Sequence, residues 1–327
     1  MRKQKNARHP AYFCVILILV LVILISGLRI LESTVFYDGQ EQEVQRVSKS
    51  KTVEGVDYFP RQDITVMLVM GIDQEGPVKS SESYTNPGAA DMIMLAIFDE
   101  KEESIRVLAL NRDTMLEMPV LGIGGRQAGT AYGQLALAHT YGNGLESSCE
   151  NTRNAVSAFL GGIRIDYYVS MNMDAIGLLN DAVGGVSVTV VDDFSAVDAT
   201  IPMGQTLLRG EQARHYLQIR AEVGNQLNLS RMERHRTYLK GFAEAARFHM
   251  ETDSAFVANT YAEVSPYVVT DCSVTVLTNM MERYGNYILQ EVVSPEGENI
   301  LGQEYYEFFV DEAQLEKLVL RLFYAPK

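Results

Sequence analysis

The chain has 327 residues, of which 47% are hydrophobic and 21% are charged, and its formal net charge is −14. This length and composition supply enough apolar side chains for one large or two ordinary domains, and they exclude a disordered chain. The negative charge also argues against nucleic-acid binding, which needs a broad positive surface. We therefore expect no nucleic-acid partner.

An almost unbroken apolar run, YFCVILILVLVILISGL (residues 12–28), follows a short basic leader. As a helix that rises about 1.5 Å per residue, such a run can just cross a hydrocarbon core of about 30 Å. Because basic residues favour the cytoplasmic side of a membrane, we expect a cytoplasmic leader over 1–11, a single transmembrane anchor over 12–30 and an extracytoplasmic remainder. The alternative is a cleavable signal peptide, but the run is long for one and no A-x-A-like cleavage site follows it.

Two cysteines, Cys149 and Cys272, would then face an oxidising compartment. They could form a disulfide bond, although their distance in the sequence says nothing about the geometry that a bond requires. The pairing stays open at this point.

The segment 31–62 is mostly polar and has the composition of a linker, so we expect a stalk there and one globular domain over 63–327. Three runs open this domain, at 64–73, 91–99 and 104–113, and they are rich in Val, Ile, Leu and Met and apolar on both faces. Such runs are typical of central strands in a sheet that is covered on both sides.

Helical and strand patterns then alternate along the chain. Helices are predicted at 135–144, 149–162, 173–183, 210–220 and from Leu229 onward, and strands at 166–172, 186–190, 287–293 and 306–310. The pattern predicts an α/β fold with a mixed central sheet and helices on both faces, a three-layer α/β/α domain preceded by one N-terminal transmembrane helix.

Acidic residues stand at the ends of the first predicted strands. Asp73 ends the first strand, Asp91 opens the second, and Arg112 ends the third. If the first two strands are antiparallel neighbours, the two carboxylates meet at one edge of the sheet, where ligands of open α/β sheets collect. Two close carboxylates repel unless a cation shares them, and Mg²⁺ prefers such oxygen ligands. The alternative is that each Asp caps a turn.

Basic residues gather in SRMERHRTYL (residues 230–239), where Arg231, Arg234 and His235 share one face of a predicted helix, with Arg220 a short loop upstream. Guanidinium groups that face a metal-bound acid pair would suit a pyrophosphate, because they donate paired hydrogen bonds to its oxygens. The alternative is an ordinary solvated helix face.

Six stretches of the sequence, in this order, carry a resemblance to a known family: VMLVMGID, ADMIMLAIFDEKEESIRVLALNRDTM, LALAHTYGNG, GGIRIDYYVSMNMDAIGLLNDAVGGVSVTV, GEQARHYLQIR and NLSRMERHRTYL. From about Ile64 to Phe242 the chain resembles the LytR-CpsA-Psr family of membrane-anchored phosphotransferases. The resemblance implies a cell-membrane protein that transfers a glycan polymer from an undecaprenyl-pyrophosphate donor to a hydroxyl of peptidoglycan, with Mg²⁺.

The resemblance also assigns roles to the residues above. It implies that Asp73 and Asp91 are metal ligands, and that Arg112, Arg220 and Arg231 are catalytic residues that bind the pyrophosphate. No residue is assigned as the general base, and the glycan polymer is not identified.

The chain departs from the family pattern at the same site. Gln218 stands where the family has an arginine, His235 where it has a glutamine, and Ala89 and Ala90 precede Asp91 where an arginine is common. Gln218 and His235 would still face the pyrophosphate, with Gln218 donating a hydrogen bond and His235 becoming cationic near pH 6. The alternative function is a catalytically weak or inactive extracytoplasmic module that binds polyprenyl phosphate and acts in regulation.

Overall fold

The computed structural model describes residues 50–122, 125–219, 223–224, 228–253, 255–285, 287–303 and 305–327. Its strands are β1 (Lys51–Val53), β2 (Val56–Pro60), β3 (Ile64–Ile72), β4 (Ala90–Asp99), β5 (Ser104–Leu110), β6 (Met115–Leu121), β7 (Gln127–Gln134), β8 (Tyr167–Asn172), β9 (Val186–Val190), β10 (Gly204–Leu208), β11 (Val268–Thr270), β12 (Ile288–Val293), β13 (Gly297–Leu301), β14 (Tyr306–Val310) and β15 (Tyr324–Pro326). Its helices are η3 (Leu135–Thr140), α2 (Glu146–Phe159), α3 (Met173–Ala182), α4 (Glu211–Gln218), α5 (Asn228–Thr252), α6 (Phe256–Val264), η4 (Ser265–Tyr267), α7 (Val274–Tyr284) and α8 (Glu312–Phe323).

A six-stranded sheet with the order β11-β8-β3-β4-β5-β12 forms the centre of the fold. It is mixed, because β3 pairs antiparallel with β4 and parallel with β8, while β5 pairs antiparallel with β4 and parallel with β12. The mixed central sheet predicted from the sequence is therefore confirmed. The first two predicted strands are antiparallel neighbours, as the argument for Asp73 and Asp91 required.

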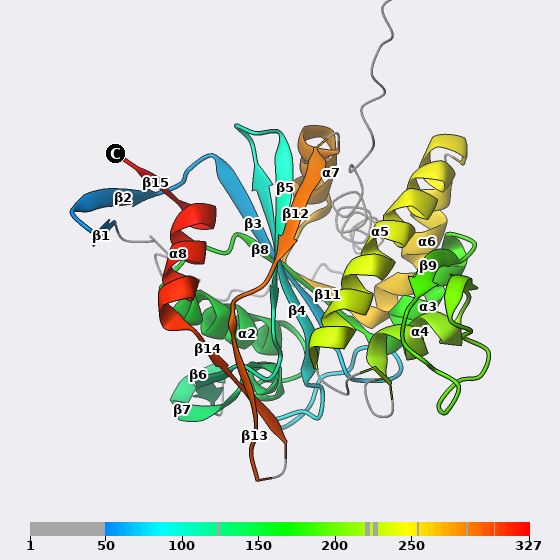
Figure 1. Ribbon diagram of the computed structural model, residues 1–327, viewed down its shortest axis with the longest axis horizontal. Helices are drawn as coiled ribbons and strands as arrows, with labels where there is room; N and C mark the ends of the chain where they lie inside the picture. The colour runs from blue at the N-terminus through cyan, green and yellow to red at the C-terminus, as the bar shows by residue number, and fades with distance from the viewer. Residues whose placement is uncertain are drawn as a thin grey trace, which may run out of the picture.

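Helices cover both faces of this sheet (Figure 1). Successive side chains of β3 point to opposite faces. Met67 and Val69 join the core beneath α3, α4 and α5, whereas Leu68 and Met70 join the core beneath α2 and α8. Since both faces are buried, β3 is apolar at nearly every position, and the same property identified it in the sequence.

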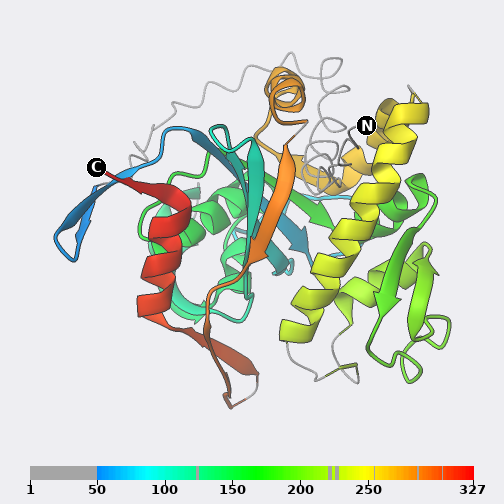
Figure 2. The ribbon, with the colours of Figure 1, turned by 45° about the horizontal axis from the view of Figure 1, so that its top comes forward.

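The long helix α5 runs across one side of the domain, next to the small sheet of β9 and β10 (Figure 2). Gly241 permits this close approach, because an added Cβ atom would lie 2.4 Å from the carbonyl oxygen of Ser187 in β9. The approach brings the N-terminal turns of α5, with Arg231, to the edge of the central sheet.

The N-terminal part of the described chain differs from the linker expected over 31–62. Residues of β2 pair antiparallel with the C-terminal strand β15, so 51–60 belong to the folded domain. These strands lie at the surface and are therefore mostly polar, so the sequence did not show the apolar pattern of a strand. The predicted leader 1–11 and anchor 12–30 lie outside the described residues, and within the described ranges no helix has the length and apolarity that a membrane crossing needs.

Two hairpins, β6–β7 and β13–β14, were not predicted as such. The sequence of β7, QAGTAYGQ, is small and polar, and most of its residues are exposed, so it carries no apolar alternation. The two hairpins meet where the backbone N–H of Phe308 donates to the carbonyl of Asp113, 2.8 Å away. The C-terminal hairpin therefore attaches to the residue that follows Arg112.

The two cysteines are free thiols, and both are buried. The Cys149 thiol donates to Ser170 Oγ, 3.3 Å away, and the Cys272 thiol lies 3.9 Å from Asp271 Oδ1. Burial raises the pKa of each thiol to about 12, so neither is a reactive thiolate at neutral pH. The structure does not contain the possible disulfide.

A buried ion-pair cluster closes the end of the sheet that lies opposite the candidate site. Asp99 is 0% exposed, and its Oδ2 accepts from Arg61 Nη1 at 2.7 Å and from Arg106 Nη1 at 2.6 Å. Burial alone would raise the pKa of Asp99, but hydrogen bonds from Arg61, the Glu102 backbone and Arg106 outweigh it and lower the pKa to about 2. The cluster joins the start of β3 to the ends of β4 and β5.

We expect Asp99→Asn to lower the free energy of unfolding by about 3–5 kcal/mol, because two arginines lose a buried counter-ion. The folded-state pKa lies below the unfolded value, so the stabilisation is complete above about pH 4 and disappears as the pH falls toward 2. Urea unfolding between pH 7 and pH 3 measures both effects.

The control is Asp63→Asn, because Asp63 is 39% exposed and pairs with the same Arg61, so about 1 kcal/mol or less is expected. An equal loss for both variants would contradict the assignment.

Candidate functional site

The candidate site lies where β3 ends, β4 begins and β5 ends. The backbone N–H of Asp73 donates to the carbonyl of Ala89 at 2.8 Å, which joins the two strand ends. In the β3–β4 register Gly71 pairs with Met92 and Ile72 pairs with Ala90, so Asp91 is an extra residue on β4. Such a bulge redirects a side chain and is frequent beside functional sites.

Asp91 is the centre of a buried cluster with two arginines. One carboxylate oxygen accepts a short hydrogen bond from Arg112 Nη1, and the other accepts from Arg231 Nη1 at 2.8 Å. A second Arg231 donor, Nη2, lies 3.3 Å from the Asp91 backbone oxygen. The structure therefore brings together three residues that the sequence placed in the site.

The burial of this cluster makes its charges consequential. The Arg231 side chain is 2% exposed, Asp91 is 9% exposed and Arg112 is 14% exposed. Arg112 Nε also lies 3.5 Å from Asp113 Oδ1, and Asp113 is 1% exposed, so two guanidinium groups face two carboxylates in a region that water reaches poorly. The guanidinium groups offer donors to an incoming anion, because charge-assisted hydrogen bonds strengthen where the local dielectric is low.

Asp73 and Gln218 form a second pair at the outer side of the cluster. Asp73 is exposed, and its Oδ1 accepts a hydrogen bond from Gln218 Nε2 at 2.9 Å. Gln218 ends α4, so this bond joins that helix to the end of β3. Arg220, predicted as a catalytic residue, lies outside the described residues.

His235 does not have the role that the sequence suggested. It is buried, and its Nε2 donates to the carbonyl of Leu217 at 2.9 Å. Burial, together with the nearby charge of Arg231, lowers the pKa of His235 from 6.5 to about 3. The expectation that His235 becomes cationic near pH 6 is therefore wrong, because the sequence did not reveal its burial.

Arg234 also has a structural position. Its guanidinium donates to the carbonyls of Tyr216 and Ile219 and pairs with Asp192 Oδ2 at 2.8 Å. These bonds attach α5 to the end of α4. Of the three basic residues on this helix face, Arg231 alone reaches the Asp91 cluster.

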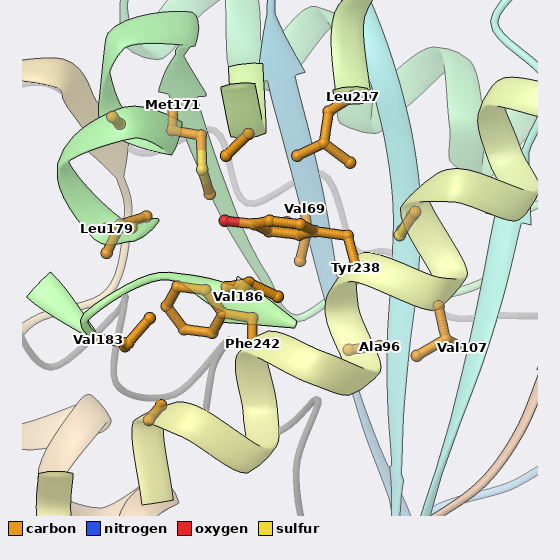
Figure 3. Close-up of a cluster of buried hydrophobic side chains, with 14 of the residues drawn as sticks. Val69, Ala96, Val107, Met171, Leu179, Val183, Val186, Leu217, Tyr238 and Phe242 are labelled. Carbon is orange, nitrogen blue, oxygen red and sulfur yellow. The ribbon is translucent and has the colours of Figure 1, made fainter. Parts of the chain in front are cut away.

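An apolar cavity of about 90 Å³ opens beside the cluster, between the sheet and helices α3, α4 and α5. Figure 3 shows apolar side chains of this region, with Tyr238 of α5 directed toward Met171 and Phe242 directed toward Val183. Tyr238, Phe242 and Met171 line the cavity. Asp91, Gln218 and Arg231 line the same cavity. A chain-like apolar ligand could thus lie inside while its polar end meets the arginines.

The fit of a divalent cation can be judged from the two carboxylates. No group of three or more potential metal-ligating His, Cys, Asp or Glu side chains occurs among the described residues. Asp73 and Asp91 supply oxygen ligands of the type that Mg²⁺ prefers, but both oxygens of Asp91 accept from arginines. Asp73 also accepts from Gln218, so the donor chemistry suits Mg²⁺ while the oxygens of Asp91 already have partners in the free protein.

Sequence reasoning missed one charged residue at this site. Arg214 lies one helical turn before Gln218, and its Nη1 lies 3.3 Å from Gln218 Oε1. The i, i+4 spacing on a predicted helix is the signal that could have identified it.

The protein is thus an α/β protein with a mixed central sheet covered on both faces by helices. Its candidate site is an arginine–carboxylate cluster at the mouth of an apolar cavity. The model of the LytR_cpsA_psr family matches residues 32–323, and the chain belongs to this family.

Known relatives agree with this membership. The chain is 29% identical over 228 residues to the polyisoprenyl-teichoic acid–peptidoglycan teichoic acid transferase TagU of Halalkalibacterium halodurans, covering 69% of this chain and 66% of that protein. It is 28% identical to the protein of the same name from Enterococcus faecalis, covering 71% and 69% of the two chains. The crystal structure of B. subtilis TagV shares the fold, with a TM-score of 0.59 at 22% identity over 80% of this chain and 96% of that one.

Proposed function

We propose that the protein is a membrane-anchored phosphotransferase that attaches a glycan polymer, carried on a polyprenyl pyrophosphate, to peptidoglycan. The observation that carries the proposal is the convergence of Arg112 and Arg231 on Asp91 at the polar mouth of an apolar cavity. The names of the TagU relatives, which describe teichoic acid transfer to peptidoglycan, support the same reaction class. The basic leader 1–11 and the apolar run 12–30 support a single-pass anchor with the domain outside the cell.

The pyrophosphate of the donor would replace Asp91 as the hydrogen-bond acceptor of the two arginines. Phosphate oxygens accept paired hydrogen bonds from guanidinium groups, so Arg112 and Arg231 would turn from the carboxylate to the pyrophosphate. The polyprenyl chain would occupy the cavity lined by Val69, Met171 and Phe242. Binding the tail in this way fixes the headgroup at the sheet edge and excludes water from it.

The transfer itself forms one bond and breaks another. An acceptor hydroxyl oxygen bonds to the phosphorus that carries the glycan, the bond from this phosphorus to the bridging oxygen breaks, and polyprenyl monophosphate leaves. Arg112 and Arg231 stabilise the charge that develops on the phosphate oxygens. No described residue is assigned as the base that receives the hydroxyl proton.

Asp73 and Asp91 would hold Mg²⁺ in this complex. The ion would supply Lewis-acid stabilisation of the pyrophosphate oxygens. It would also give Asp91 a cationic partner in place of the two arginines, which would then bind the phosphate.

A second function, binding without turnover, is favoured by one observation. Gln218 and His235 are neutral, and His235 donates to Leu217 rather than toward the cluster. A site with fewer cations stabilises transition-state charge less well, so a regulatory module that binds the donor is the alternative.

The proposed function is tested by titrating the full chain, in detergent micelles, with a short-chain polyprenyl pyrophosphate in a calorimeter. We expect Mg²⁺ to strengthen binding of the polyprenyl pyrophosphate and the Arg112→Ala substitution to weaken it. Arg236→Ala is the matched control, because Arg236 lies on α5 with its side chain 52% exposed. Absence of binding with and without Mg²⁺ would reject both functions.

The two functions are separated in cells. If the protein is a transferase, Arg112→Ala abolishes attachment of the polymer to the wall while the variant still accumulates in the membrane. If polymer attachment in that strain is unchanged, the transferase function is rejected and the regulatory binding function remains.

A further inference from the structure

We propose that Arg214 is a specificity residue of this site, which binds the outer phosphate of the donor headgroup and so selects a pyrophosphate over a monophosphate. The inference rests on the proposed function. It starts from the two unequal edges of the Arg214 guanidinium.

One edge of this guanidinium is held tightly. Arg214 Nε donates to Glu211 Oε2 at 2.7 Å, and Nη2 lies 2.5 Å from the same oxygen. Glu211 is one helical turn before Arg214 on α4. This pair fixes the guanidinium against its own helix, and it raises the pKa of Arg214, so the side chain is cationic at every relevant pH.

The other edge is held loosely. Nη1 lies 3.4 Å from Glu75 Oε1 and 3.3 Å from Gln218 Oε1. Both distances exceed the 2.7–2.9 Å that is typical of strong charge-assisted hydrogen bonds. Glu75 is 77% exposed, so water can replace Arg214 as its partner at little cost. Nη1 therefore remains free to exchange a weak partner for a phosphate oxygen.

This loose edge is linked to Asp73 through the amide group of Gln218. Gln218 accepts from Arg214 with Oε1, donates to Asp73 with Nε2, and lines the cavity next to Asp91 and Arg231. Arg214 is 19% exposed, whereas Arg231 is 2% exposed. The site thus has inner guanidinium groups at Arg112 and Arg231 and an outer one at Arg214, where Glu211 and Glu75 balance the charge of the free protein.

A headgroup with two phosphates matches two such positions. The phosphate next to the polyprenyl chain would meet the inner arginines, since these lie at the mouth of the cavity that holds the chain. The second phosphate would lie outward, beside Asp73 and Gln218, where Arg214 offsets the exposed Asp73 carboxylate. A polyprenyl monophosphate has no group at the outer position, so it gains nothing from Arg214.

The test compares two ligands on the full chain in detergent micelles. For Arg214→Ala we expect about tenfold weaker binding of a short-chain polyprenyl pyrophosphate, the effect of one lost charge-assisted hydrogen bond. Binding of the matching polyprenyl monophosphate should change less than twofold. Arg209→Ala is the matched control, because it removes the same charge from an exposed position just before α4, and it should change neither affinity.

A second variant separates binding from a structural role in α4. In a Gln218→Arg background, a guanidinium stands directly opposite Asp73, so adding Arg214→Ala should cost less than twofold. If Arg214 only stabilises α4 through Glu211, the loss persists in that background and affects both ligands equally, which would overturn the proposal. If the unaltered protein binds neither ligand, the proposed function itself fails.

Discussion

Arg231→Ala is expected to weaken binding of a polyprenyl pyrophosphate at least tenfold and to lower the free energy of unfolding by about 3–5 kcal/mol. Both effects follow from one geometry. The guanidinium is 2% exposed and donates to the side chain and the backbone of Asp91, so its loss removes an anion-binding group and leaves Asp91 with Arg112 alone. Calorimetry with the ligand and urea unfolding measure the two quantities.

Two further variants make this prediction specific. Arg231→Lys keeps the charge but loses the planar pair of donors, so binding should recover only in part. Arg236→Ala, on the exposed side of the same helix, should change stability by about 0.5 kcal/mol or less. Arg231→Ala with unaltered affinity would show that the buried pair serves the fold alone.

Asp91→Asn is expected to have opposite effects on transfer and on metal-free binding. Transfer should fall by about two orders of magnitude or more, because the variant loses one of the two proposed ligands of Mg²⁺. Binding of polyprenyl pyrophosphate without Mg²⁺ should become about tenfold stronger, because Arg112 and Arg231 no longer have a carboxylate that competes with the phosphate. Calorimetry in the presence of a chelator measures the second effect.

Asp73→Asn is the control for this prediction. Asp73 is exposed and accepts from the neutral Gln218, so its loss should leave metal-free binding unchanged while it reduces the effect of Mg²⁺. Weaker metal-free binding in Asp91→Asn would mean that Asp91 positions the arginines for the ligand and does not compete with it.

The sequence predicted the parts of the fold whose patterns are local. β3, β4 and β5 were found because strands buried on both faces are rich in apolar residues at successive positions, and β9 because apolar and polar residues alternate in it. The hairpin β13–β14 was only half found. Its first strand, β13, is exposed at most positions and therefore lacks a run of buried apolar residues that would mark it in the sequence.

The candidate site was predicted in composition but not in arrangement. Strand-end reasoning placed Asp73, Asp91 and Arg112 at one edge of the sheet, and helix periodicity placed Arg231 on the facing helix. In the structure Arg112 donates to Asp91, whereas Asp73 is exposed and accepts from Gln218. The bulge that points Asp91 at both arginines is a property of strand pairing, which a single strand sequence does not contain. His235 is neutral because other segments bury it, and this burial cannot be read from the local sequence. From the sequence we therefore expected a cationic His235.

The two ends of β3 have different neighbours, and under the proposed membrane anchoring this sets a minimum length for the segment before the domain. At the Ile64 end, β2 pairs with the C-terminal strand and the chain arrives from residue 50, whereas the candidate site lies beyond the Ile72 end. Nine strand residues span about 30 Å. A donor held in the membrane therefore meets the site only if the domain lies along the bilayer or turns its far end toward it. Shortening the segment between the anchor and Lys51 should stop transfer once the remaining residues, at about 3.3–3.6 Å each when extended, can no longer cover that length.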